Sequence, residues 1–425
     1  MQNFPWFKFR FMRGLMVMVL LSAFDCDAAK LFAVDAQYTG SSGPADLLVE
    51  NRSFPDLINE LFNGSGEFSE LSGVEQLNAS VRFFAVPDSF RLAYDKQNVD
   101  GLFEVQITSS LTGLSKTFLA VDADDLQEKI VDWLFLNADE DAKQLLEAIF
   151  AVSTAGLSDG NPGAATARMS DNAFYLFGFY SLINQGAGMR GHESGAHFGL
   201  SVNVDSFEIE SRSGTLYGES FQVALPLWLH FNQRLSYVGQ IDFEEILVEE
   251  TAFYGLGANM GLAFRPVVRS GMDRFGWQLT PFVGGRAIVS VDGVTAAMLY
   301  HYGLNNRFEW RVFDHSIVSL VSQYAPYDNL AISVGDYSLN TVVDQQILKN
   351  GIMLEVPLAF NNSLVGQVSA IDTRFLEDFG ADNYQTYGLG LGYRLVTFSV
   401  FANASFIKTD TYDNSRFNLG CGWDL

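Results

Sequence analysis

The stretch from Gly191 to His197 brings together residue types that could hydrolyse an ester. Ser194 lies between His192 and His197, and Glu193 stands beside it. A serine hydroxyl becomes a nucleophile when a histidine takes its proton and a third group orients that histidine. Here the cluster falls in a glycine-rich stretch before the first clear strand, where a Ser–His pair is usually incidental. We therefore predict no enzymatic activity and no catalytic residue.

Two groups of residues are candidates for metal ligands. The histidines and glutamate of the same cluster lack the His-Glu-x-x-His spacing that places two imidazoles on one helix face. Asp122, Asp124 and Asp125 lack the twelve-residue loop that binds calcium, and acidic residues suit the start of a helix. The sequence also contains no phosphate-binding loop and no dinucleotide-binding fingerprint. We expect no metal and no cofactor.

The composition is apolar, aromatic and poor in charge. Of 425 residues, 48% are hydrophobic and only 18% are charged, with 38 glycines and 37 phenylalanines. A typical soluble domain has about 25% charged residues. The formal net charge of −24 argues against nucleic acid as a partner, because phosphate binding needs clustered lysine and arginine.

Residues 1–28 have the layout of a secretory signal peptide. Three basic residues precede a short apolar run from Leu15 to Phe24. Small residues then frame a cleavage point after Ala28. We therefore expect an exported protein.

Residues 29–157 are predicted to form a small soluble α+β domain. Short segments indicate strands at 81–86, 90–94, 102–108 and 116–121. Two segments with apolar residues at helical spacing then follow, and each begins with acidic residues that suit a helix N-terminus.

Residues 195–425 alternate between apolar and polar side chains with a period of two. No run beyond the N-terminus reaches the ~18 apolar residues of a spanning helix, and a closed barrel is the other structure that spans a membrane. Counting between turns predicts about 12 strands, an even number, with ten and fourteen as the alternatives because strand boundaries shift by ~2–4 residues. Short turns near 231–233, 270–274, 313–315, 361–362 and 394–397 alternate with longer or more acidic connections near 211–216, 247–251, 292–295, 327–344, 377–383 and 410–414.

The last strand carries the most specific pattern. From Ser415 to Leu425, apolar residues alternate strictly with polar or very small ones. The chain resembles bacterial outer-membrane β-barrel proteins, porin-like or autotransporter-like, without matching one family. The resemblance implies an all-β antiparallel transmembrane barrel after the α+β domain. It also implies that barrel-assembly machinery reads a signal at Phe417, Leu419, Trp423 and Leu425.

Residues 158–194 are predicted to be a linker with an apolar segment. Gly, Ser, Asp, Asn and Pro dominate its first part. Ala173 to Ile183 is apolar on all sides. It could be a strand, a helix inside the barrel or a helix on the membrane surface, and the pattern does not decide among them.

Glycine and charged residues share the strand face opposite the large apolar residues. In a barrel, this face lines the lumen. The charges there favour equally an ion-selective pore lining or a salt-bridged plug that fills a closed lumen. The predicted pore-lining residues are Arg265, Arg286, His301, Arg307, Glu309, Arg311, Glu355, Arg394 and Arg416.

The leading functional prediction is a porin-like barrel of the cell outer membrane that passes or gates small solutes. The N-terminal domain would be periplasmic and would serve as an accessory or a plug. A non-conducting structural or display barrel, or an autotransporter-type translocator, is the alternative, and an outer-membrane lipid hydrolase is the third. The expected partners are outer-membrane lipid, the barrel-assembly machinery and a periplasmic protein.

Overall fold

The computed structural model describes most of the chain after residue 31. The predicted signal peptide, residues 191–194 and Leu425 lie outside the described residues. These are 32–40, 43–51, 57–58, 60–61, 76–83, 86–95, 102–136, 139–152, 164–179, 195–211, 214–249, 251–268, 274–290, 295–312, 316–330, 332–334, 337–339, 343–358, 363–376, 383–394, 398–409 and 412–424.

The N-terminal domain is built on a six-stranded antiparallel sheet, with the strand order β2-β1-β3-β4-β5-β6. The four strands predicted from the sequence are present with shifted ends, and two earlier strands, β1 and β2, were missed. The strands are β1 (Phe32–Gly40), β2 (Gly43–Asn51), β3 (Gln76–Phe83), β4 (Val86–Asp95), β5 (Phe103–Ser109) and β6 (Leu114–Ala120).

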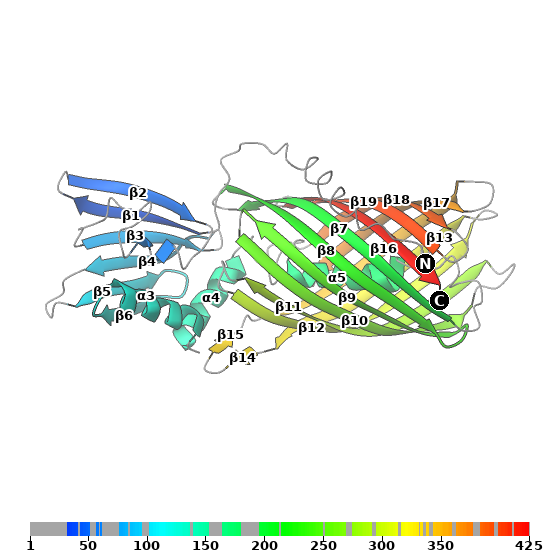
Figure 1. Ribbon diagram of the computed structural model, residues 1–425, viewed down its shortest axis with the longest axis horizontal. Helices are drawn as coiled ribbons and strands as arrows, with labels where there is room; N and C mark the ends of the chain where they lie inside the picture. Colours follow the sequence, from blue (N-terminus) through cyan, green and yellow to red (C-terminus); the bar gives the residue numbers. More distant parts are fainter. Residues whose placement is uncertain are drawn as a thin grey trace, which may run out of the picture.

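Helical segments cover one face of this sheet (Figure 1). They are α3 (Ala123–Val131), its continuation η2 (Asp132–Leu136) and α4 (Glu140–Val152). Leu126, Ile130 and Leu145 are fully buried in one apolar core with the inward residues of the strands. The domain is therefore α+β, as the sequence predicted.

The aspartates 122, 124 and 125 form the start of α3. Asp122 is the N-cap, and its carboxylate accepts a hydrogen bond from the Asp125 backbone N–H at 2.8 Å. Hydrogen bonds from Lys129 and from the Val121 backbone N–H lower the pKa of Asp125. Within the described part of the chain, no cluster of three metal-ligating side chains occurs.

Twelve antiparallel strands close into a barrel, and β20 pairs with β7 to complete the ring. The number agrees with the sequence-based count. The strands are β7 (Gly195–Ser211), β8 (Gly214–His230), β9 (Leu235–Val248), β10 (Thr251–Val267), β11 (Phe275–Ser290), β12 (Thr295–Arg311), β13 (Ile317–Leu330), β16 (Asp344–Pro357), β17 (Leu364–Phe375), β18 (Asn383–Arg394), β19 (Phe398–Lys408) and β20 (Tyr412–Asp424).

Apolar side chains form an exposed belt around the outside of the barrel. On β10, for example, Leu256, Met260 and Leu262 are each about half exposed. Aromatic rings gather at both edges of the belt, with stacked pairs such as Phe198–Trp423 and Trp277–Phe308 near the Gly195 end. Tyr254 and Tyr302 lie toward the opposite edge.

Several strands continue beyond this belt at the end opposite Gly195, and on β7 the polarity there is reversed. Glu208 and Glu210 of β7 face outward, whereas Phe207 and Ile209 are buried inside. We call the buried inward ring at this level the apolar collar. It comprises Phe207, Ile209, Leu216, Ile246, Val248, Phe253, Ile288, Leu299, Tyr327, Ile347, Phe375, Tyr384, Ile407 and Tyr412.

This reversal changes two predicted connections. The segments at 211–216 and 247–251, predicted as longer or more acidic connections, are not long loops. β7 pairs with β8 up to Ser211–Gly214, and β9 pairs with β10 up to Val248–Thr251. The long connection at this end joins β13 to β16 and carries a short hairpin of β14 (Ile332–Val334) and β15 (Tyr337–Leu339).

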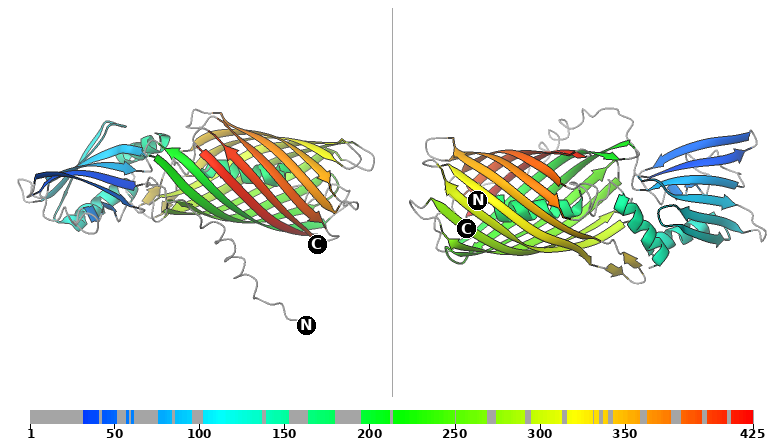
Figure 2. Two further views of the ribbon diagram at one scale, coloured as in Figure 1. Left: turned by 90° about the horizontal axis from the view of Figure 1, so that it is seen from above. Right: turned by 180° about the vertical axis from the view of Figure 1, so that it is seen from behind.

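The N-terminal domain lies at the collar end of the barrel, and the last strand ends at the other (Figures 1 and 2). The segment η2 lies against β15. Gly195, where the barrel begins, pairs with His230 at the same end as Asp424.

Among the described residues, no helix has the length and apolar character needed to cross a membrane.

Candidate functional site

A helix occupies the barrel lumen. It consists of α5 (Ala165–Phe174) and its continuation η3 (Tyr175–Phe179), and it lies within the ring of strands in Figure 1. Every residue from Ala165 to Asp171 is buried. The described part of the apolar segment that the sequence left undecided, residues 173–179, is thus helical and lies inside the barrel, and the helix begins earlier than expected.

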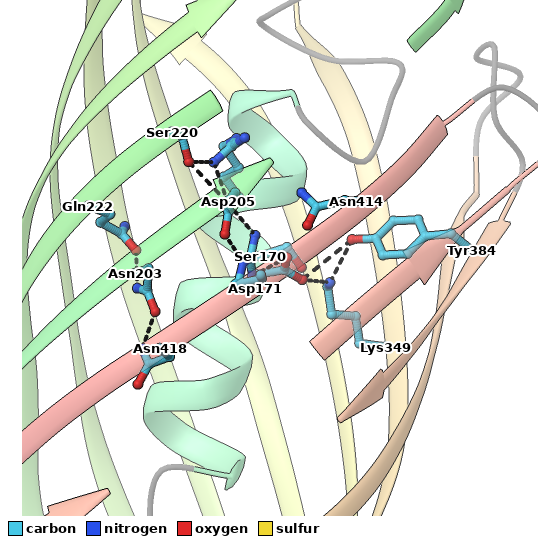
Figure 3. Close-up of polar contacts among 12 residues, drawn as sticks. Ser170, Asp171, Asn203, Asp205, Ser220, Gln222, Lys349, Tyr384, Asn414 and Asn418 are labelled. Carbon is cyan, nitrogen blue, oxygen red and sulfur yellow. Dashed lines mark hydrogen bonds and ion pairs between the residues drawn. The ribbon is translucent and has the colours of Figure 1, made fainter. Parts of the chain in front are cut away.

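Two charged residues of α5 bind strands on several sides of the lumen. Arg168 Nη1 donates to Asp205 of β7 at 3.0 Å and to Glu244 of β9 at 2.5 Å. Asp171 accepts from Lys349 of β16 and, at 3.1 Å, from Arg416. Figure 3 shows Asp205 and Lys349 reaching the helix from the surrounding strands, with Lys349 beside Asp171.

The pairs join into one series of alternating charges. Arg416 also donates to Asp205 at 2.8 Å, and Arg286 of β11 pairs with both Asp242 and Glu244. The four cations balance the four anions, which is the condition for burying charge at tolerable cost. We call the series the ion chain: Lys349, Asp171, Arg416, Asp205, Arg168, Glu244, Arg286 and Asp242.

Glycines on the inward face of the strands make room for the helix. A Cβ at Gly351 of β16 would stand 2.6 Å from Phe179 and 2.9 Å from Phe174. A Cβ at Gly261 of β10 would stand 2.9 Å from Phe177, whose ring stacks on Phe282. The phenylalanines of α5 and η3 therefore fill the volume that these glycines leave.

We predict that Gly351→Val lowers the free energy of unfolding by about 1–3 kcal/mol, because it overpacks the contact with Phe179 and Phe174. The matched control is Gly255→Ala on β10, also inward, where an added Cβ meets nothing closer than 3.6 Å. Urea unfolding in detergent micelles measures both. Equal stability of the two variants would contradict the close packing of the helix.

Six of the predicted pore-lining residues are buried on the inward face. Arg286 belongs to the ion chain, and Arg307 pairs with Glu309. Arg265 donates to Gln278 at 3.1 Å and to Ser236 at 3.0 Å, and His301 lies 2.7 Å from Asn259 Oδ1. The six are Arg265, Arg286, His301, Arg307, Glu309 and Glu355.

None of the other three is described as fully buried. Arg311 is half-buried at the end of β12, and Arg416 is partly buried in the ion chain. Arg394 ends β18, and its side chain lies outside the described residues. That the nine line an open pore stays a prediction.

The sequence analysis did not single out Arg168, Asp171, Asp205 or Lys349 as site residues. Arg168 and Asp171 stand three apart on what proved to be a helix, a spacing that places them on one face. This spacing is visible in the sequence, but it lies in a segment that was predicted to be a linker.

A polar cavity of about 70 Å³ remains beside the helix. It lies against β7, β8, β9, β17, β19 and β20, whereas the phenylalanines pack toward β10 and β16. Along β7, Ser201 and Asn203 of this cavity come before Asp205 of the ion chain, and Phe207 of the collar follows. The lumen is thus layered from the Gly195 end as polar cavity, ion chain and apolar collar.

Only part of the Ser–His cluster is described. Gly191 to Ser194 lie outside the described residues, and His197 is buried on β7 with its ring centroid 5.4 Å from that of Trp228. Of the predicted assembly signal, Phe417, Leu419 and Trp423 lie on β20. Their role in assembly stays a prediction.

No protein-family model matches the chain, and no curated protein matches it. Among solved structures, it is similar to the translocator domain of the autotransporter NalP from Neisseria meningitidis, with 13% identity over 61% of this chain and 98% of that one and a TM-score of 0.43. The β domain of the Bordetella autotransporter Brka is 10% identical over 55% of this chain and 99% of that one, with a TM-score of 0.38. A Pseudomonas aeruginosa FadL homologue is 8% identical over 54% of this chain and 90% of that one, with a TM-score of 0.33.

A closed ring of β-strands with an apolar exterior, aromatic residues at both edges and a polar interior is the structure of barrels that span outer membranes. The protein is an outer-membrane β-barrel. The similarities above concern architecture alone.

Proposed function

We propose that this protein is a display barrel of the autotransporter type, which holds its N-terminal domain at the cell surface and tethers it through the lumen. The observation that carries the proposal is α5 within the ring of strands, bound by the ion chain. In the sequence, α5 and η3 stand between the domain, which lies at the collar end, and Gly195, which lies at the other end.

The orientation is argued from the two ends of the barrel. At the collar end, the strands run past the apolar belt with glutamates outside, and the longest connection carries a hairpin of its own. Outer-membrane barrels have their longer loops outside the cell and their short turns in the periplasm. The collar end is accordingly proposed to face the cell surface, with the N-terminal domain on the same side. The periplasmic location predicted from the sequence is the alternative that the test below distinguishes.

Porin-like passage is less well supported by this arrangement. An open pore needs a continuous aqueous path, whereas the helix and the ion chain that binds it occupy the lumen and the apolar collar follows at the next level. The barrel is accordingly proposed to be non-conducting while α5 is in place.

The test is labelling of single cysteines on intact cells, with Cys421, a free thiol on β20, replaced by serine. Thr117→Cys lies on an exposed strand position of the N-terminal domain, and Gln233→Cys lies in the exposed turn after β8. A membrane-impermeant maleimide should modify the first in intact cells and the second only after the outer membrane is permeabilised. The reverse pattern would place the domain in the periplasm and overturn the proposal.

A further inference from the structure

The cavity beside α5 has a polar wall made mainly of uncharged side chains. Its walls carry amides and hydroxyls from Asn203, Gln240, Gln367, Asn403 and Ser405. Neighbouring strands present several of them at one level, since Asn403 pairs with Asn418 and Asn418 with Asn203. Amides donate and accept hydrogen bonds without carrying charge.

The single charge at this cavity is already neutralised. Arg416 donates to Asp171 and Asp205 of the ion chain. A charged molecule would have to leave water without an opposite charge to meet it, which is costly. The lining therefore selects an uncharged ligand.

Two buried atoms of the lining lack a hydrogen-bond partner in the part of the chain that the structure describes. They are Asn172 Nδ2 on the helix, a donor, and Asn418 Oδ1 on β20, an acceptor. A hydroxyl group both donates and accepts, so hydroxyls can satisfy both walls. The rings of Tyr175, Phe179 and Phe401 add apolar faces to the same cavity.

We propose that this cavity binds a neutral polyhydroxylated molecule the size of a monosaccharide. Its volume of about 70 Å³ holds roughly five waters when one water needs about 10–15 Å³, close to the space of a single sugar ring. Hydroxyls would bind the amide wall, and the apolar face of the ring would lie against the aromatic side chains. The site is independent of the direction in which the N-terminal domain faces.

Isothermal titration of the full-length protein in detergent micelles tests the site, with glucose as the neutral probe and gluconate as its charged counterpart. Glucose should bind saturably and gluconate at least about tenfold more weakly. Asn403→Ala should weaken glucose binding about tenfold, the loss expected for one or two hydrogen bonds. Asn78→Ala, the same change on the exposed face of the N-terminal sheet, should leave it unchanged.

Retained heat-dependent gel mobility shows that each variant is folded. Folded protein that gives no heat with glucose overturns the proposal, because the cavity then holds only water. Equal binding of glucose and gluconate, or full binding by the folded Asn403→Ala variant, places the ligand elsewhere and also overturns it.

Discussion

Arg168→Met is expected to lower the free energy of unfolding by about 3–5 kcal/mol, the cost of removing one partner from a buried ion pair. The Arg168 side chain is 3% exposed, and its partners Asp205 and Glu244 are equally buried. Without Arg168, the ion chain is cut at its centre and carries a net negative charge. Urea unfolding followed by tryptophan fluorescence and by gel mobility measures the loss.

The matched control is Arg374→Met on β17. Arg374 also pairs with a carboxylate, Asp372, at 2.8 Å, but its side chain is 61% exposed. Exposed pairs contribute about 0–1 kcal/mol, so this variant should remain close to wild type. A cost for Arg168→Met no larger than that of the control would show that the helix is not anchored by charge.

Replacing residues 164–179 with a glycine–serine segment of equal length is expected to convert a closed barrel into a conducting one. The segment contributes α5 and η3, and a helix with its side chains occupies a cylinder about 10–12 Å across. Its removal should leave an aqueous path of roughly that width along the inward charges. Single-channel recording in planar bilayers distinguishes steps of current from the flat trace expected of the intact protein.

A second variant separates the helix from the domain that precedes it. Removal of residues 29–152, with α5 retained, should leave the barrel closed. Conductance in this truncated protein would make the N-terminal domain the plug. The variant without the helix must be shown by gel mobility to be folded. If it then conducts no current, the strands' own side chains fill the lumen.

The barrel was predictable because its signal is local and repeated. Alternation on β10, where Leu256, Met260 and Leu262 face outward, depends only on the period of a strand. The strand count followed from the turns. The placement of charged residues inward followed from the same alternation, so Arg265 and Arg307 were found on the correct face.

The lumen helix was not predictable in the same way. Amphipathic periodicity requires one wet face, and α5 is buried on all sides. The strands carry the signal for its position instead, at Gly351 and Gly261, since a glycine inside a strand often marks the close approach of another group. A single sequence shows these glycines but does not identify the group that packs against them.

The extent of the strands was misjudged for a related reason. Residues 211–216 and 247–251 were predicted as connections, whereas Leu216, Leu247 and Val248 belong to strands. Beyond the apolar belt the alternation continues through residues 207–210 of β7, with Phe207 and Ile209 inside. Where the strand passes from lipid into water, the apolar side chains move from the outer face to the inner face, while the β-strand backbone continues.

The six-stranded sheet of the N-terminal domain has a consequence for retention. With neighbouring strands about 4.8 Å apart, the sheet is roughly 24 Å wide, whereas the lumen accommodates a single helix about 10–12 Å across. A chain crossing the barrel in the proposed direction must therefore pass unfolded. Once the sheet has formed at the collar end, it is too wide to pass back through the lumen. Folding of the domain would therefore prevent the chain from returning, and this step needs no external source of energy.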